Sequence, residues 1–249
     1  MKIIAIIPAR MGSSRFPGKP LVPILGRSMI EHVYKRTAMS LMLDDVFVAT
    51  CDEQIRSSVQ AFGGKAVMTA DNHERASDRV AEAITGLDAD VVVMVQGDEP
   101  MLHPDMIGEA VALYKVQPDT PCINLTKQID NEVDFLNPGT IKVVTDLQDN
   151  ALYMSRKPIP SNSGNNFSNI TAKKQVCIIP FNRAALIKFA NLDSTPLEIA
   201  ESIDMLRFIE HGIPVRMINT KFDTQAVDTP EDLVRVEKLM RDDQLIKTY

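Results

Sequence analysis

The start of the chain carries the feature that most constrains its fold: five consecutive apolar residues, Ile3 to Ile7, without polar alternation. A strand of this kind must be covered on both faces, which is typical of a central parallel sheet. Val91–Val95 repeats the pattern, and Val46–Thr50 is a similar run. Helical patterns separate these strands, over residues 28–39, 52–61 and 73–84. The alternation predicts an α/β fold in which the loops after the strands meet at one sheet edge.

The pattern changes after about Pro118. Strands are predicted over residues 121–126, 139–144 and 176–181, with short or irregular connections. Amphipathic helices are predicted over residues 196–210 and 230–240, each with a proline near its first turn. Residues 161–169 are polar and form a loop or lid candidate. Because neither a repeat nor a clear linker divides the chain, we expect one domain over residues 1–249.

Composition excludes several classes of protein. The 27 Lys and Arg against 33 Asp and Glu give a net charge of -6, which does not favour nucleic-acid binding. Three separate cysteines without Cys-x-x-Cys spacing indicate neither a disulfide framework nor a zinc site. No apolar run approaches the roughly 18 residues that cross a membrane, and the first run is shorter than a signal-peptide core. We therefore expect a soluble cytoplasmic protein with no membrane or nucleic-acid partner.

The loop after the first strand, residues 8–20, combines three cations with two glycines. Arg10, Arg15 and Lys19 repel one another unless a multiply charged anion lies among them. The glycines let backbone N–H groups approach phosphate oxygens, and Ser13 adds a neutral donor. The glycine spacing and the proline after Lys19 exclude a Walker loop, and the loop is not the G-x-G-x-x-G fingerprint. It is therefore a candidate phosphate-binding loop.

Acidic residues directly follow the buried strand Val91–Val95. The sequence Gln96-Gly-Asp-Glu-Pro places Asp98 and its neighbour at the carboxyl end of a central strand, which suits Mg²⁺ beside phosphates. Capping of the next turn would also explain these acids. Asp228 is the second candidate ligand, although its segment is an equally good helix start. The sequence Asp88-Ala-Asp lies before the strand, at the wrong sheet edge, and is rejected as a metal site.

Together these segments resemble one family, the CMP-Kdo synthetases or 3-deoxy-manno-octulosonate cytidylyltransferases, over essentially the whole chain. The resemblance implies a three-layer, Rossmann-like α/β fold of the nucleotide-diphospho-sugar transferase type, with a central, mostly parallel mixed sheet. It also implies a nucleotide-binding half, residues 1–118, and a sugar-binding and dimerisation half, residues 119–249. The landmarks that carry it are Ile7–Leu21, Val48–Thr50, Val95–Pro100, Ala151–Arg156 with Pro158–Pro160, and Val227–Leu233.

The resemblance implies that the anomeric hydroxyl of a 3-deoxy-2-ulosonic acid attacks the α-phosphorus of CTP, giving a CMP-sugar and pyrophosphate for lipopolysaccharide biosynthesis. The implied catalytic residues are Arg10, Lys19, Asp98 and Asp228, with Mg²⁺ held by the two aspartates. The implied nucleotide-binding residues are Arg10, Ser13, Arg15, Lys19, Ser77, Arg79 and Gln96. The implied sugar-binding residues are Gln96, Arg156, Gln175, Glu198 and Glu201. The family also implies a homodimer.

Departures from the family pattern fall mainly where the sugar would bind. A usual histidine and two usual tyrosines are replaced by Gln175, Ile179 and Phe181. The changes remove hydroxyl donors, and a site built to hydrogen-bond particular hydroxyls discriminates strongly. We therefore expect either Kdo or a modified acceptor such as 8-amino-3,8-dideoxy-octulosonate. Glu198 or Glu201 would pair with the amine of the modified form.

Two other functions are compatible with the same features. A nucleotidyltransferase acting on a sugar phosphate or polyol phosphate would also carry an Arg/Lys loop after the first strand. A non-catalytic CTP sensor would need the loop but not two metal-binding carboxylates. The presence of both Asp98 and Asp228 favours an enzyme over a sensor.

Overall fold

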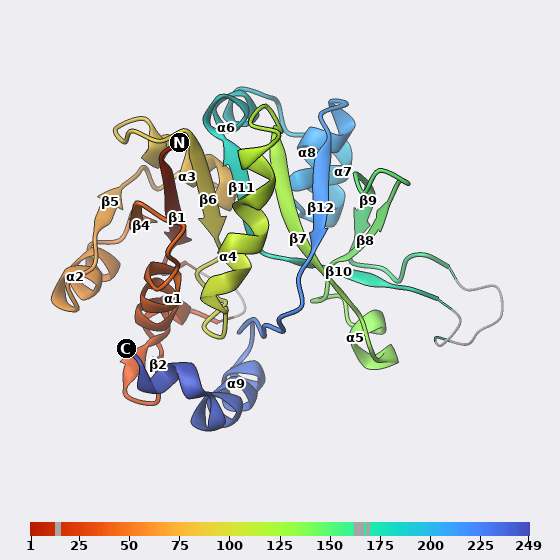
Figure 1. Cartoon of the computed structure of the whole chain (residues 1–249). Coiled ribbons are helices and arrows are strands. Elements are labelled where there is room, and N and C mark those ends of the chain that lie inside the picture. Colours follow the sequence, from red (N-terminus) through yellow and green to blue (C-terminus); the bar gives the residue numbers. More distant parts are fainter. Residues whose placement is uncertain (13–15, 162–166, 168–169) are drawn as a thin grey trace.

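The computed structural model describes residues 1–12, 16–161, 167 and 170–249. Within them, ten strands form one mixed sheet in the order β5-β4-β1-β6-β11-β7-β10-β8-β9, with β12 paired to β7 (Figure 1). The parallel part consists of β1 (Ile3–Ala9), β4 (Asp45–Thr50), β5 (Ala66–Met68) and β6 (Val91–Val95). The remainder consists of β7 (Cys122–Gln128), β8 (Lys142–Thr145), β9 (Ala151–Ser155), β10 (Lys173–Val176), β11 (Ile178–Asn182) and β12 (Val215–Asn219). The predicted α/β fold with a mixed sheet is confirmed.

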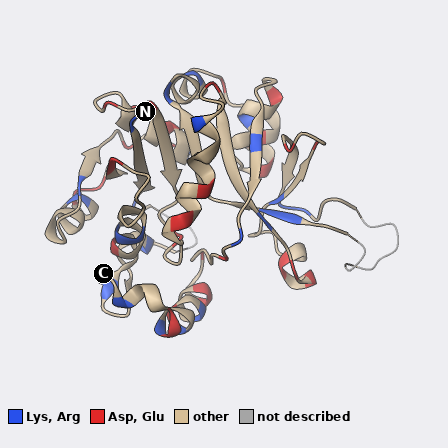
Figure 2. Ribbon diagram, viewed as in Figure 1, with Lys and Arg blue, Asp and Glu red and all other residues tan. Residues whose placement is uncertain are grey.

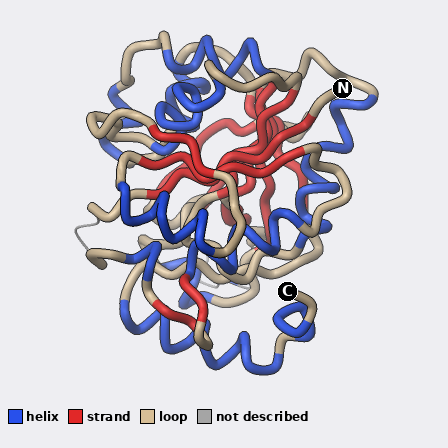
Figure 3. The backbone as a smooth tube through the Cα atoms, turned by 90° about the vertical axis from the view of Figure 1, so that its left-hand side faces the viewer, coloured by secondary structure: helices blue, strands red, loops and turns tan. Residues whose placement is uncertain are grey.

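Strand β1 is buried on both faces, as its apolar run predicts. Ile4 and Ile6 join the core layer beneath α3 (Ala76–Ile84), α6 (Arg183–Ala190) and α8 (Met205–Glu210). Alternate residues of β1, such as Ala5, join the opposite layer beneath α1 (Met29–Ala38), α2 (Glu53–Ala61) and α4 (Pro104–Val111). Figure 3 shows the helices on both sides of the sheet. The three layers follow from a strand that cannot tolerate water on either face.

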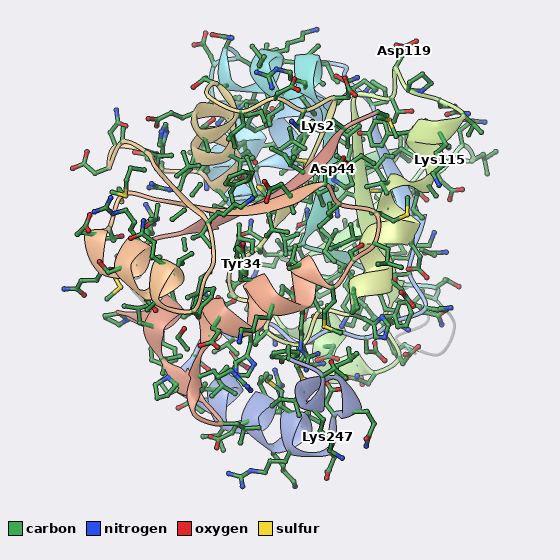
Figure 4. All side chains as sticks on the ribbon, turned by 60° about the vertical axis from the view of Figure 1, so that its left-hand side comes forward. Lys2, Tyr34, Asp44, Lys115, Asp119 and Lys247 are labelled. Atoms are coloured by element: carbon green, nitrogen blue, oxygen red, sulfur yellow. The ribbon has the colours of Figure 1, made fainter. Side chains whose placement is uncertain are left out.

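Strand β1 begins at the edge of the sheet away from the acidic residues that follow β6. Figure 4 labels Lys2 and Asp44 there, and the carboxylate of Asp44 accepts a hydrogen bond from the N–H of Ile3 (2.7 Å). The carboxylate of Asp90 accepts a bond from the N–H of Lys2 (2.6 Å). Asp90 therefore binds the start of β1, at the sheet edge opposite the one where Asp98 follows β6.

The second half of the chain differs from the sequence prediction at several elements. The strand predicted over residues 176–181 corresponds to β11, and its first residue instead ends β10. The two strands separate at Cys177: both pair with β7, but β10 also pairs with β8 and β11 with β6. The helix predicted over residues 196–210 is also two elements, α7 (Pro196–Glu201) and α8, because Ser202 adopts a left-handed φ of 53°. Strands β9, β10 and β12 were not predicted. Helix α3 begins at Ala76 rather than His73.

The chain ends in an arm that packs outside the main sheet. Helix α9 (Pro230–Asp242) and the 3-10 helix η4 (Gln244–Lys247) lie beside α1, as Figure 1 shows. They enclose a small core with the hairpin of β2 (Pro23–Ile24) and β3 (Arg27–Ser28). Its buried members are Ile24, Met29, Val227, Val236 and Met240. Among the described residues, no helix is long and apolar enough to span a membrane.

Candidate active site

Lys19 lies between two carboxylates at the carboxyl edge of the parallel strands. Its ammonium is 2.7 Å from Asp98 Oδ2 and 3.2 Å from Asp228 Oδ1. Lys19 begins the 3-10 helix η1 (Lys19–Leu21), Asp98 follows β6, and Asp228 precedes α9. Burial disfavours the ammonium, but the two carboxylates outweigh it and raise the pKa of Lys19. Three sequence-predicted residues therefore meet at one point.

Two close backbone approaches hold this point together. The N–H of Val227 donates to the carbonyl of Asp98 (2.9 Å), which ties the segment before α9 to the end of β6. At Gly97, a Cβ atom would lie 2.9 Å from the carbonyl oxygen of Pro8. This is closer than ordinary van der Waals contact, so the missing side chain at Gly97 lets β6 deliver Asp98 beside the loop that follows β1.

The segment at Asp228 is both a helix start and part of the site. Thr229 caps α9, and its hydroxyl accepts a bond from the N–H of Asp232 (3.3 Å). The carboxylate of Asp232 in turn accepts bonds from the N–H groups of Asp228 (3.1 Å) and Thr229 (3.0 Å). Because Thr229 and Asp232 cap the helix, the side chain of Asp228 can face Lys19.

Asp98 and Asp228 fit a Mg²⁺ site chemically. Mg²⁺ is commonly held by one or two carboxylates together with water and substrate phosphates, and these two side chains already face one cation. In the described part of the chain, no group of three or more His, Cys, Asp or Glu side chains could hold a metal. The arrangement therefore suits a cation shared with a phosphate ligand rather than an all-protein metal site.

Glu99 places a third carboxyl group next to this pair. The residue is buried and accepts a hydrogen bond from the hydroxyl of Thr224. Burial, together with the charge of Asp98, raises the pKa of Glu99 to about 7. This bond joins the end of β6 to the segment before α9 a second time.

A cavity of about 620 Å³, here called the Arg10 cavity, opens beside Lys19. Its walls include Arg10, Lys19, Arg79 and Gln96. The Arg10 guanidinium donates to the carbonyl of His73 (3.1 Å), and that of Arg79 donates to the carbonyl of Ala70 (3.1 Å). Cations from the first loop and from α3 thus share one cavity, as the sequence analysis expects of a phosphate-binding region.

Three of the predicted nucleotide-binding residues are not found among the described residues that line the Arg10 cavity. Ser77 is buried, donates its hydroxyl to Asp204 (2.8 Å) and is absent from the lining of the Arg10 cavity. Its predicted direct contact is therefore not supported by its position. Ser13 and Arg15 lie outside the described residues.

A second cavity of about 580 Å³, the Gln175 cavity, lies on the other side of Asp98. Gln175 lines it and donates from Nε2 to the side chain of Asn124 (2.6 Å). Arg156 and Asp228 also belong to its walls. The residues that line both cavities are Gln96, Asp98, Arg156, Ser202 and Asp204. The two cavities are therefore contiguous along these five shared residues.

The structure does not bring the two predicted sugar-binding glutamates to either cavity. Glu198 is fully buried, and its carboxylate accepts two bonds from Arg207, at 2.8 Å from Nε and 2.7 Å from Nη2. The carboxylate of Glu201 accepts bonds from Ser155 Oγ (2.7 Å) and from the N–H of Arg156 (2.8 Å). Neither glutamate lines either cavity, because both carboxylates are engaged by neighbouring protein groups, so their direct contact with a sugar stays a prediction that these positions do not support.

Two charged residues that were not predicted as site residues, Asp204 and Lys142, lie at or next to the cavities. Asp204 is half-buried at the boundary between the cavities, and desolvation of its carboxyl group raises its pKa. Lys142 is buried directly behind the Gln175 cavity. Asp204 follows the break in the predicted helix, and Lys142 stands within a predicted strand. Neither position had a sequence signal that separates a site residue from a structural one.

A cationic loop and two converging carboxylates at the edge of such a sheet define a nucleotide-binding α/β protein of the transferase type. The model of one family, "Cytidylyltransferase", matches residues 4–221. The chain therefore belongs to the cytidylyltransferase family.

Individual relatives within this family show which of its members the chain resembles. A protein of Geobacter metallireducens named 3-deoxy-manno-octulosonate cytidylyltransferase is 44% identical over 97% of this chain and 99% of its own length. A protein of the same name from Geobacter sulfurreducens is 42% identical over 96% and 100%. A solved structure of CMP:2-keto-3-deoxy-manno-octonic acid synthetase complexed with CTP has a TM-score of 0.89 at 38% identity, covering 97% of this chain and 99% of its own.

Proposed function

We propose that this chain transfers CMP from CTP to a 3-deoxy-2-ulosonic acid, 3-deoxy-manno-octulosonate or a modified form of it, for lipopolysaccharide biosynthesis. The anomeric oxygen forms a bond to the α-phosphorus, the bond from that phosphorus to the bridging oxygen breaks, and pyrophosphate leaves. The hydroxyl proton passes to solvent. The observation that carries the proposal is the convergence of Lys19, Asp98 and Asp228 between two contiguous cavities.

In this proposal the triphosphate lies in the Arg10 cavity. Arg10 and Lys19 bind its phosphates and stabilise the negative charge that develops on leaving pyrophosphate. Ser13 and Arg15, in the same loop, complete the phosphate contacts. Arg79 and Gln96 bind the nucleoside side, and Ser77 supports them through Asp204.

Asp98 and Asp228 would hold the Mg²⁺ that the family implies. When bound, the metal neutralises phosphate charge and lowers the pKa of the attacking hydroxyl. The chain's own part is to keep two carboxylates facing one point and to place Lys19 beside them. The positive charge of Lys19 reduces the repulsion between the two carboxylates and an anionic nucleotide.

The acceptor would occupy the Gln175 cavity, with Arg156 binding its carboxylate. The Arg156 side chain donates to three backbone carbonyls, those of Glu201 (2.7 Å), Pro138 (3.2 Å) and Ser202 (3.2 Å). These three bonds fix the orientation of the Arg156 guanidinium, and none of their acceptors is a carboxylate, so its positive charge is not neutralised by them. An arginine held in this way suits bidentate binding of a carboxylate.

A second acceptor candidate is 8-amino-3,8-dideoxy-octulosonate. With Glu198 and Glu201 engaged elsewhere, and Asp98 assigned to the metal, Asp204 is the other carboxyl group that lines both cavities, and we propose it as the partner of the amine. The resemblance also leads us to propose a homodimer that acts in the cytoplasm. Light scattering after size-exclusion chromatography measures the assembly.

The test is a screen of pyrophosphate release with mass identification of the product. CTP is incubated with 3-deoxy-manno-octulosonate or its 8-amino form, and each nucleoside triphosphate with sugar 1-phosphates. We expect a CMP-sugar from CTP and an ulosonate, abolished by EDTA and restored by Mg²⁺. Faster turnover of a sugar phosphate would replace the proposal with the sugar-phosphate alternative. Tight CTP binding without pyrophosphate release would indicate a sensor.

A further inference from the structure

Lys142, in β8, is a fully buried lysine without an acidic partner among the described residues. Its ammonium donates to three backbone carbonyls, those of Asn137 (2.9 Å), Thr140 (2.6 Å) and Arg156 (2.6 Å). An ammonium has three N–H donors, so these bonds use all of them. Burying such a charge is costly unless it is well satisfied, and here carbonyl dipoles alone satisfy it.

These bonds link Lys142, the turn at residues 137–140 and Arg156 in one hydrogen-bond network. Lys142 fixes the turn at residues 137–140, and the same turn supplies the Pro138 carbonyl that accepts from Arg156 Nη1 (3.2 Å). Lys142 also binds the Arg156 carbonyl directly. The turn and Arg156 together form one wall of the Gln175 cavity. One ammonium therefore holds Arg156 at its backbone and, through the turn, at its guanidinium.

The guanidinium in this network keeps donors for a ligand. Its bonds to protein carbonyls use one N–H on each of its three nitrogens. A guanidinium has five N–H groups, so one remains on each terminal nitrogen. Two such groups are the donor set that a carboxylate binds in a bidentate manner.

We propose that Lys142 is a positioning residue for the acceptor: its ammonium orients Arg156 to bind the acid's carboxylate. The inference rests on the proposed function, because it assigns the Gln175 cavity to the acceptor. Lys142 does not touch the substrate, since its three donors are already used within the protein.

The charge of Lys142 depends on pH in the range where the enzyme can be assayed. Burial and the neighbouring charge of Arg156 lower the pKa of Lys142 to about 8, while Glu201 on α7 favours the ammonium. Across the sheet, Lys142 pairs with Lys174 of β10 and Ser155 of β9, and directly opposed residues share a face. Figure 2 shows the basic residues of β10, which include Lys174. The charged groups that face Lys142 from these elements are thus Arg156, Lys174 and Glu201.

Loss of the proton from Lys142 removes one donor and turns a lone pair toward carbonyl oxygens, which releases the turn and Arg156. The KM for the acceptor should therefore rise about tenfold between pH 7 and pH 9, while the KM for CTP stays constant. The experiment measures kcat and both KM values across this range for the unmodified enzyme, K142M, K142R and K127M. Lys127 is the matched control, because it donates to a backbone carbonyl (Lys221, 2.8 Å) on the same sheet but lines neither cavity.

We expect K142M to raise the acceptor KM at every pH and to abolish its alkaline rise, with the CTP KM unchanged. K142R should also lack the rise, since arginine keeps its charge here, and should recover part of the affinity. K127M should behave as the unmodified enzyme. An acceptor KM that is flat from pH 7 to 9, or an unchanged rise in K142R, would overturn the assignment even where K142M fails to fold. Absence of any CMP-sugar at all pH values would instead overturn the proposed function on which it depends.

Discussion

The ammonium of Lys19 lies 3.2 Å from the carboxylate of Asp228, a residue 209 positions further along the chain. The two segments meet because the hairpin after Lys19 and the helix after Asp228 share a small core of their own. Ile24 from the hairpin and Val227 and Val236 from the arm are fully buried in it. The site is thus assembled by packing of the arm against the start of the chain as well as by the main sheet.

Neutralising either carboxylate beside Lys19 should remove most of the activity. D98N and D228N retain the shape of the side chains but lose the charge that a divalent cation requires. The metal's contribution of several kcal/mol to the transition state corresponds to at least about a 100-fold fall in kcat. Pyrophosphate release at saturating CTP and Mg²⁺ measures the loss, and calorimetry measures Mg²⁺ binding directly.

D88N is the matched control, because Asp88 lies near the other end of β6 and pairs with Lys2 at the surface (3.3 Å). It should leave kcat unchanged. Near-normal turnover in D98N or D228N would show that the carboxylate in question is dispensable for the reaction.

A methyl group at Gly97 should displace Asp98. In G97A the new Cβ would meet the carbonyl oxygen of Pro8 at 2.9 Å, so β1 and β6 must separate. Overpacking of this kind costs about 1–3 kcal/mol of unfolding free energy, and we expect a larger relative loss in kcat than in CTP affinity. G86A, where a Cβ atom meets nothing within 4 Å, is the control. Equal stability and activity of both variants would exclude the close approach as a constraint.

The C-terminal arm should depend on a buried ion pair with α1. Arg36 is 1% exposed, and its guanidinium lies 2.5 Å from Asp243 and 2.9 Å from the hydroxyl of Tyr249. R36M leaves Asp243 without this partner, and we expect a loss of about 2 kcal/mol in urea unfolding, since one side of the pair is partly exposed.

R241M removes a comparable pair from the exposed face of the same arm, between Arg241 and Glu237 (2.9 Å). Exposed pairs of this spacing contribute under about 0.5 kcal/mol. Similar losses in R36M and R241M would contradict the stabilising role of the buried pair.

Glu99 should make the stability of the protein depend on pH. Its pKa is raised from an ordinary value near 4.5 to about 7, first by burial and then by the charge of Asp98. Between these values the folded state holds a proton that the unfolded state has released, so the free energy of unfolding falls as pH rises. The full shift corresponds to about 3 kcal/mol.

E99Q keeps an acceptor for the Thr224 hydroxyl and removes the titration. Relative to the unmodified protein, E99Q should therefore gain about 3 kcal/mol of stability between pH 4 and pH 8. Urea unfolding in EDTA across this range measures the difference. Parallel stability profiles for the two proteins would show that Glu99 titrates as an ordinary surface glutamate.

The sequence alone led to the parallel half of the fold, because apolar runs such as Ile3–Ile7 leave no face for water. It also led to the meeting of Lys19 and Asp98, since residues after parallel strands share an edge, whereas the place of Asp228 beside them was implied only by the family resemblance. In the second half, local patterns were insufficient. The change of neighbours at Cys177 and the left-handed turn at Ser202 depend on which elements pack against the segment.

Residue types and their order along the chain thus determined which groups could bind phosphate and cation. Tertiary structure decided which polar side chains face a cavity and which serve as internal supports. From the sequence, the charged Glu198 is expected at the surface or in a binding site. In the structure it is buried in the core, where Arg207 binds its carboxylate. Lys142 was likewise indistinguishable from a surface lysine in sequence, and only the fold surrounds it with three carbonyl groups, two from one turn and one from Arg156. Burial and partner geometry decide these roles, because a charge is stable inside a protein only where the fold supplies its hydrogen bonds.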